Sequence, residues 1–138
     1  MIIADTGFWL ALGNRRDRHH DAARAALARL TEPLITTWPV MTETCQLLAA
    51  RLGVDAELRF LRAARDGAFS IFPLDASHFT RIEILVEKYR GLPMDLADAS
   101  LVLLAEDLGS GRILSTDTRD FRTYRWKRRK PFQNLMPG

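Results

Sequence analysis

The chain has 138 residues, of which 47% are hydrophobic, and a formal net charge of +3; at this length roughly 68% of the unfolded surface can be buried, so we expect one globular domain over residues 1–138. Its apolar runs are too short to cross a bilayer and residues 1–13 contain no Lys or Arg, so we expect no membrane span, no signal peptide and a cytoplasmic protein. Cys45 is the only cysteine, which excludes an internal disulfide and a multi-cysteine zinc site, and its apolar helical setting predicts a buried core residue.

Short β-rich runs alternate with helical patterns along the chain, which predicts a parallel sheet covered by helices. Gly53, Gly67, Gly91 and Gly109 each follow a helical pattern, and glycine favours the left-handed residue that ends many helices. The strands are expected at residues 1–4, 34–37, 69–73 and 112–115, with a weaker one at 131–136, and the helices near residues 8–12, 18–30, 39–52, 55–66, 76–89 and 96–108.

Four acidic residues stand near the ends of these apolar runs. Asp5 follows the first expected strand and Asp117 the fourth, while Glu43 lies one turn into the helix that Pro39 opens. Asp98 lies in the first turn of the 96–108 helix, where the helix dipole favours an anion. Because strand carboxyl ends share one rim in open α/β sheets, these carboxylates can meet there around a divalent cation.

A purely structural alternative applies to most of these acids. Asp5 and Asp117 are suited to cap the helix or turn that follows each of them, since Asp accepts hydrogen bonds from the free amides of a first turn. Asp95, three residues before Asp98, is suited to cap the 96–108 helix in the same way. Asp98 could be one more acid on a solvated face, but this helix is too apolar for a surface helix.

Four motifs in chain order resemble those of PIN-domain proteins, specifically VapC-type toxin ribonucleases. The resemblance covers nearly the whole chain. The motifs are Ile3-Ala4-Asp5-Thr6, Thr42-Glu43, Pro93-Met94-Asp95-Leu96-Ala97-Asp98-Ala99-Ser100 and Ser115-Thr116-Asp117-Thr118-Arg119-Asp120-Phe121.

The resemblance implies a three-layer α/β/α PIN-like fold with a short, mostly parallel central sheet of four to five strands. It also implies the toxin of a type II toxin–antitoxin pair that hydrolyses RNA phosphodiester bonds. Acids without a His or Cys ligand favour hard cations, so Mg²⁺ or Mn²⁺ is the expected cofactor. The resemblance assigns the catalytic and metal-binding roles to Asp5, Glu43, Asp98 and Asp117, with Asp95 and Asp120 as further neighbours, and places the hydroxyls of Thr6 and Thr116 near the site.

The basic residues are concentrated near the carboxyl end. Residues 119–130 hold seven Arg or Lys and one acid, a net charge of +6, whereas the remaining residues have a net charge of −3. Cations interleaved with Tyr124 and Trp126 suit single-stranded RNA, with a solvated surface loop as the alternative. The predicted RNA-binding residues are Arg122, Arg125, Trp126, Lys127, Arg128 and Arg129, helped by the loop at residues 15–18.

The resemblance also implies two protein partners, a second copy in a homodimer and a cognate antitoxin whose extended segment covers the acidic groove. The apolar residues Phe8, Trp9, Leu12, Leu47 and Leu48 could form these interfaces or belong to the core. Two other functions fit parts of the sequence. One is a catalytically inactive PIN-type module that binds RNA or protein, and the other is a receiver-type signalling domain, which needs a lysine near its last strand that this chain does not clearly provide.

Overall fold

The computed structural model describes residues 1–92 and 94–137, so that Pro93, the first residue of the third motif, lies outside the described residues. Five strands form one sheet in the order β3-β2-β1-β4-β7, and every neighbouring pair is parallel. This sheet confirms the mostly parallel arrangement that the sequence predicts. Its strands are β1 (Ile2–Ala4), β2 (Leu34–Thr37), β3 (Phe69–Phe72), β4 (Arg112–Leu114) and β7 (Gln133–Asn134).

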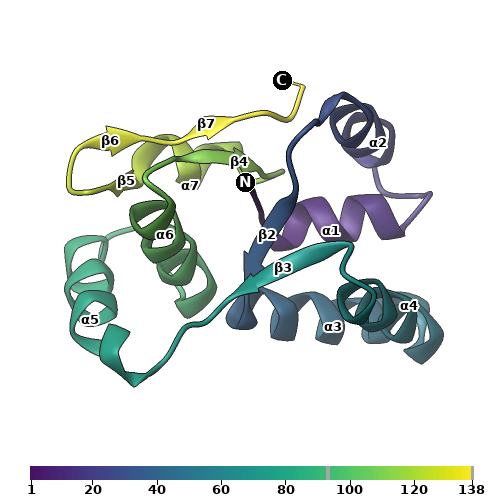
Figure 1. The fold of residues 1–138 in the computed structure, drawn as a ribbon, viewed down its shortest axis with the longest axis horizontal. Coiled ribbons are helices and arrows are strands. Elements are labelled where there is room, and N and C mark those ends of the chain that lie inside the picture. Colours follow the sequence, from purple (N-terminus) through teal and green to yellow (C-terminus); the bar gives the residue numbers. More distant parts are fainter. Residues whose placement is uncertain (93, 138) are drawn as a thin grey trace.

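Helices cover both faces of the sheet and complete the three layers (Figure 1). In this view α5 and α6 lie on one side, and α1, α3 and α4 on the other. A receiver domain has the strand order 2-1-3-4-5, so the observed order excludes that alternative. The helices are α1 (Thr6–Gly13), α2 (His20–Arg29), α3 (Trp38–Leu52), α4 (Val54–Arg65), the 3₁₀ turn η1 (Ala76–His78), α5 (Phe79–Lys88), α6 (Leu96–Leu108) and α7 (Thr118–Thr123).

The core is centred on β1, β4 and α6. Ile3, Ala4, Ile113 and Leu114 are fully buried, which is typical of central strands covered on both faces. Nearly every residue of α6 from Ala97 to Ala105 is also buried, because this helix packs against the sheet, α5 and β5. The apolar character of residues 96–108 therefore reflects contact on several sides, and this packing fixes the position of the helix that carries Asp98.

The prediction for residues 131–136 was only partly right. The chain first forms an antiparallel hairpin from β5 (Arg125–Trp126) and β6 (Lys130–Pro131), and only then joins the sheet edge as β7. Pro131 has no amide hydrogen for a ladder, which suits a short hairpin strand better than a sheet strand. The helix α7 was not predicted, Gly91 is not among the glycines with positive φ, and Cys45 is only partly buried. No helix in the described ranges is long and apolar enough to cross a membrane.

Candidate active site at the junction of β1 and β4

Three of the sequence-predicted acids, Asp5, Glu43 and Asp117, follow the carboxyl ends of β1, β2 and β4, around the point where the strand order reverses between β1 and β4. Asp5 directly follows β1, and Asp117 follows β4 by three residues. Glu43 lies in α3, the helix that begins directly after β2. The carboxyl ends of strands at such a reversal form a crevice in open α/β sheets, which is the usual place for ligands.

Asp5 is the most buried of these acids, with 7% of its surface exposed. Its Oδ1 accepts a hydrogen bond from the amide of Thr6 at 2.7 Å, and its Oδ2 accepts one from the hydroxyl of Ser115 at 2.9 Å. Burial raises the pKa of Asp5 to about 6, the two hydrogen bonds oppose that rise, and the charges of Asp117 and Glu43 add to it. The pKa of Asp5 is therefore raised by acids on two other segments, the loop after β4 and α3.

Asp98 is held between the start of α6 and the segment before β5. Its Oδ2 accepts a hydrogen bond from the Tyr124 hydroxyl at 3.2 Å, and its amide donates to Oδ1 of Asp95 at 2.8 Å. Partial burial, followed by repulsion from Asp95 and then from Asp5, raises the pKa of Asp98 to about 8. Asp95 caps α6 and remains exposed, so Asp98 is the acid of this pair that points toward the buried site.

The loop after β4 connects Asp117 to Asp5 through Ser115. The Asp117 amide donates to the Ser115 hydroxyl oxygen at 2.9 Å, and that hydroxyl donates to Asp5. Asn134 in β7 fixes the serine backbone, because its side chain accepts from the Ser115 amide at 3.2 Å and donates to the Ser115 carbonyl at 2.8 Å. Asp117 also caps α7 by accepting from the amide of Asp120 at 3.1 Å.

Asp120 lies in the first turn of α7, three residues after the capping residue Asp117. Partial burial, then its interaction with Asp117, raises the pKa of Asp120. This places Asp120 at the edge of the acidic group, as a neighbour of Asp117.

Gly7 allows the first turn of α1 to approach the loop after β4. A Cβ atom on Gly7 would lie 1.9 Å from Oγ1 of Thr116, far inside van der Waals contact. The hydroxyl of the neighbouring Thr6 is buried and has no hydrogen-bond partner among the described residues. Thr6 and Thr116 are the sequence neighbours of Asp5 and Asp117, and the absence of a side chain at Gly7 allows the segments that carry these acids to approach each other closely.

The donor set fits a hard divalent cation. In the described part of the chain, no member of the group Asp5, Glu43, Asp95, Asp98 and Asp117 forms an ion pair with a basic side chain. A buried carboxylate without such a partner is costly, and oxygen ligands are those that Mg²⁺ and Mn²⁺ prefer. As the side chains stand, no three acidic, His or Cys side chains among the described residues converge closely enough to enclose an ion.

Two functional neighbours were not predicted from the sequence. In the sequence Ser115 is only one residue of a motif and Tyr124 only an aromatic ring among cations, whereas in the structure both donate hydrogen bonds to site acids. A serine two residues before Asp117 was a local signal for the first. No local signal exists for Tyr124, because it is 26 residues from Asp98.

We expect the site acids to make the protein less stable as the pH rises in EDTA. A folded-state pKa raised above the unfolded value means that the folded state holds its proton more tightly, so stability is lost between pH 4 and 6 for Asp5 and up to about pH 8 for Asp98. For Asp5 the loss is up to about 3 kcal/mol. Asp5→Asn should remove the part of this pH-dependent loss that is due to Asp5 while keeping the contact with Thr6. Urea unfolding of wild type and variant at pH 4 and pH 8 measures the free energy of unfolding in each case. An unchanged pH dependence in the variant would contradict this expectation.

The predicted RNA-binding segment forms α7 and the β5–β6 hairpin. Trp126 is buried, 7% exposed, and its indole donates to the Pro131 carbonyl at 2.9 Å, and Tyr124 is fully buried. Because both rings are buried, they do not offer the exposed faces that the predicted stacking on RNA bases requires. Arg125 is engaged too, since its Nη1 donates to three backbone carbonyls at the end of α7. The basic side chains left exposed in this segment are Arg119, Arg122, Lys127, Arg128, Arg129 and Lys130.

The loop at residues 15–18 lies away from the acids. It follows the far end of α1, an eight-residue helix that begins beside Asp5, so roughly 12 Å separate the loop from the site. His20 is fixed near this loop, because its Nδ1 lies 2.7 Å from the Ala11 carbonyl oxygen and donates to it. The contact of this loop with RNA stays a prediction, and it would lie away from the acids.

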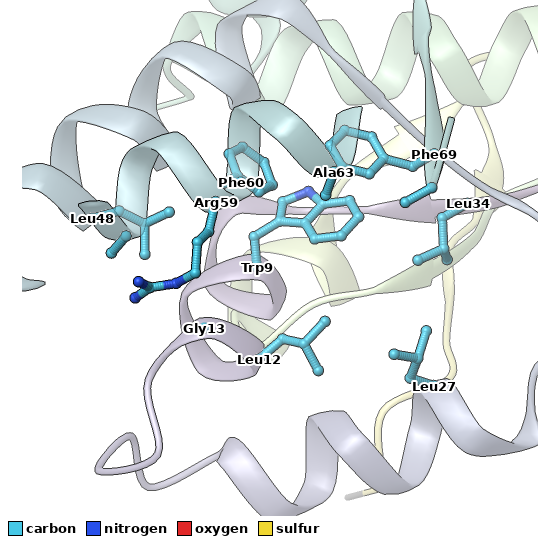
Figure 2. Close-up of a pocket in the computed structure, with 12 residues that line it drawn as sticks. Trp9, Leu12, Gly13, Leu27, Leu34, Leu48, Arg59, Phe60, Ala63 and Phe69 are labelled. Carbon is cyan, nitrogen blue, oxygen red and sulfur yellow. The ribbon is translucent and has the colours of Figure 1, made fainter. Parts of the chain in front are cut away.

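A separate apolar pocket of about 350 Å³ lies between α1, α2 and α4. Figure 2 shows the Trp9 indole beside the rings of Phe60 and Phe69, with Leu12 and Leu27 below it in this view. Phe8 and Trp9 are buried core residues, whereas Leu27 is 39% exposed. Arg59 stands at the edge of the pocket. Of the residues predicted to form an interface or the core, Trp9, Leu12 and Leu48 line this pocket.

Comparison with known proteins connects this chain and its fold to one family. The PIN domain family model matches residues 2–127. The chain is 32% identical over 124 residues to ribonuclease VapC26 of Mycobacterium tuberculosis, an alignment that covers 90% of this chain and 92% of that protein. A stretch of 53 residues, 38% of this chain and 40% of the relative, is 42% identical to the 23S rRNA-specific endonuclease VapC20 of the same species.

The crystal structure of VapC20, described as a sarcin-ricin loop cleaving toxin, has the same fold. It matches with a TM-score of 0.80 and 22% sequence identity, and the match covers 86% of this chain and 92% of that chain.

Proposed function

Because the chain belongs to the PIN-domain family, we propose that it is a metal-dependent endoribonuclease that hydrolyses RNA phosphodiester bonds as the toxin of a type II toxin–antitoxin pair. The observation that carries this proposal is Asp5, a buried acid without an ion pair at the strand reversal, whose pKa is raised further by the charges of Asp117 and Glu43. Resemblance to VapC-type ribonucleases over nearly the whole chain supports the reaction class. In this proposal residues 1–138 form a single PIN domain.

The four acids have separate roles in this proposal. Asp5 and Asp98 are the principal ligands of Mg²⁺ or Mn²⁺, Glu43 is a ligand or positions water, and Asp117 is a more peripheral ligand, with Asp95 and Asp120 beside it. The bound cation would make a water molecule easier to deprotonate and neutralise charge on the scissile phosphate. Ser115 orients Asp5, and Tyr124 orients Asp98, each by the hydrogen bond that it donates. These contacts hold the acids in place against their mutual repulsion.

The three acids that cap helices remain suitable ligands. Capping uses Oδ1 of Asp5, Asp95 and Asp117, through the amides of Thr6, Asp98 and Asp120 respectively. Each carboxylate has a second oxygen with further lone pairs. The structural role that the sequence suggested for these acids and the proposed catalytic role are therefore compatible.

Two protein partners belong to this proposal. A cognate antitoxin would place apolar side chains in the pocket beside Trp9 and Leu27 while an extended segment reaches the acids. A homodimer would cover exposed apolar surface such as Trp38 and Leu96, which are 56% and 52% exposed close to Glu43. Light scattering of the chain alone and with co-expressed antitoxin tests both assemblies, and a monomer in each sample would refute them.

The proposed activity is tested by incubating purified protein with a mixture of ribosomal, transfer and messenger RNA. We expect endonucleolytic cleavage with Mg²⁺ or Mn²⁺ and none with EDTA, and restored cleavage when excess Mg²⁺ is added back. Cleavage that persists in EDTA would refute metal dependence. Absence of cleavage of every RNA class by folded, antitoxin-free protein would favour the non-catalytic PIN module.

A further inference from the structure

The tip of the β5–β6 hairpin holds basic residues in an unfavourable backbone conformation. Lys127 and Arg128 have φ angles of 46° and 72°, in the left-handed region that long side chains rarely adopt. These two residues and the following Arg129 and Lys130 are all exposed. A strained turn persists only where its surroundings stabilise it, and such turns are concentrated at functional sites.

Glu106 on α6 stabilises this turn. Its side chain, 17% exposed, accepts a hydrogen bond from the Lys127 amide at 2.6 Å. The same carboxylate accepts two more from Arg81 on α5, at 2.9 and 2.8 Å. The turn has one further contact outside Glu106, because the Arg128 carbonyl accepts a hydrogen bond from the Lys88 ammonium at 3.3 Å. The charge of Glu106 is thus balanced by Arg81, and its effect on the hairpin is geometric.

These residues surround a hollow of about 660 Å³ between α5 and the hairpin tip. Among the described residues, Glu106 is the only acid that lines it, and Arg81 neutralises that acid. Within residues 1–92 and 94–137, Lys88, Lys127 and Arg128 form no ion pair with an acid. The hollow therefore has a net positive charge. The Lys88 ammonium uses one of its three donors on the Arg128 carbonyl, and its other donors are available to an anion.

We propose that this hollow binds a backbone phosphate of the RNA substrate through Lys88, Lys127 and Arg128, with Glu106 as the positioning residue that holds the turn. The proposal rests on the proposed function, which supplies RNA as the substrate. None of the groups that bind phosphate here needs to contact the reacting atoms. The site adds affinity and orients the strand, as phosphate contacts do in other nucleic-acid complexes.

The hollow lies at a fixed distance from the acids because both are attached to α6. Asp98 and Glu106 are eight residues apart on this helix, roughly 12 Å along its axis. The segment from Tyr124 to Lys127 contacts both ends, through the Tyr124 hydroxyl on Asp98 and the Lys127 amide on Glu106. A phosphate in the hollow and a scissile phosphate at the acids would therefore be separated by a few nucleotides of one strand.

The first test measures binding of a fluorescent single-stranded RNA in EDTA at several salt concentrations. Lys88→Gln and Arg128→Gln should each raise the dissociation constant about twofold to fivefold and reduce the salt slope by about 0.7. The control is Arg29→Gln, an equal loss of charge at an exposed residue of α2, which lies apart from α5 and the hairpin (Figure 1). Equal weakening by all three variants would mean diffuse attraction and overturn the site.

The second test separates positioning from charge, because the two effects have opposite signs. Asp107→Ala removes an exposed acid next to Glu106 and should tighten RNA binding slightly. Glu106→Ala removes the same charge but also the contact with Lys127, and we expect binding at least threefold weaker than wild type. Glu106→Gln keeps an acceptor oxygen for the Lys127 amide and should recover part of the affinity. Binding by Glu106→Ala as tight as by Asp107→Ala would overturn the positioning role.

The outcomes also separate this site from the proposed reaction. If wild type cleaves RNA in a metal-dependent way but Lys88→Gln and Arg128→Gln bind RNA with unchanged affinity, phosphate binding in the hollow would be refuted and the ribonuclease function would stand. Weakened binding in these two variants without any cleavage by wild type would support the hollow and refute the reaction. Both substitutions are on the surface, so they remain informative if Glu106→Ala fails to fold.

Discussion

Asp98→Asn and Asp5→Asn should each lower the rate of metal-dependent RNA cleavage by at least about 100-fold. Both substitutions keep the size of the side chain, and each replaces a carboxylate of the proposed ligand set by a neutral amide. The dissociation constant for RNA in EDTA should stay within about twofold of wild type, because cations at the hairpin hold the backbone. The measurements are single-turnover cleavage at saturating Mg²⁺ and RNA binding in EDTA.

Asp107→Asn is the matched control for Asp98→Asn. It removes the same charge from the same helix at an exposed residue, and it should cleave RNA at close to the wild-type rate. Cleavage by Asp98→Asn within tenfold of wild type would contradict the assignment of this acid as a principal ligand. Loss of cleavage in the Asp107 control as well would point to net charge, and not to the site, as the cause.

The proposed ligands should not contribute equally. Asp5 and Asp98 have raised pKa values, to about 6 and about 8, because Asp5 is buried, Asp98 is partly buried and both are close to other acids. Such a group gains more than an exposed acid when a cation replaces its proton. Asp117, whose Oδ1 caps α7, lies at the edge of the group, so its loss should cost less cleavage than the loss of Asp5.

The parts of this structure that the sequence predicted are those with local signals. The 34–37 strand and the 96–108 helix were predicted with the residues that the structure shows. Each has a run of apolar residues of suitable length and a boundary residue that fits its end. The acids at strand and helix ends could be placed at one rim because parallel strands share their carboxyl ends.

The parts that the sequence did not predict depend on contacts between distant residues. Trp126 alternates with cations as a surface RNA-binding aromatic would, yet it is buried because Gly111 leaves room for its indole and the Pro131 carbonyl accepts its N–H. A Cβ atom on Gly111 would lie 2.3 Å from the indole nitrogen. Likewise, only the fold brings Glu106 to the amide of Lys127, 21 residues away. Composition identified the basic segment correctly but could not say which of its side chains face solvent.

Gly7→Ala should destabilise the protein by about 1–3 kcal/mol, although the same change inside an unconstrained helix would stabilise it by roughly 1 kcal/mol. The new Cβ would lie 1.9 Å from Oγ1 of Thr116, so α1 or the loop after β4 must move. That movement changes the spacing of Asp5 and Asp117 and should lower the cleavage rate of the protein that remains folded. Urea unfolding and single-turnover cleavage measure the two effects.

A double-mutant cycle with Thr116→Ala identifies the cause of this destabilisation. Without Oγ1, the nearest atom to the new Cβ is the Cβ of residue 116 at 3.2 Å, a tight contact but one that small shifts relieve. Gly7→Ala should therefore cost at least about 1 kcal/mol less in the Thr116→Ala background than in wild type. Equal costs in both backgrounds would show that the close approach of α1 to the β4 loop does not limit the residue at position 7. A coupling of the expected size, together with recovered cleavage in the double variant, would show that this approach sets the geometry of the acids.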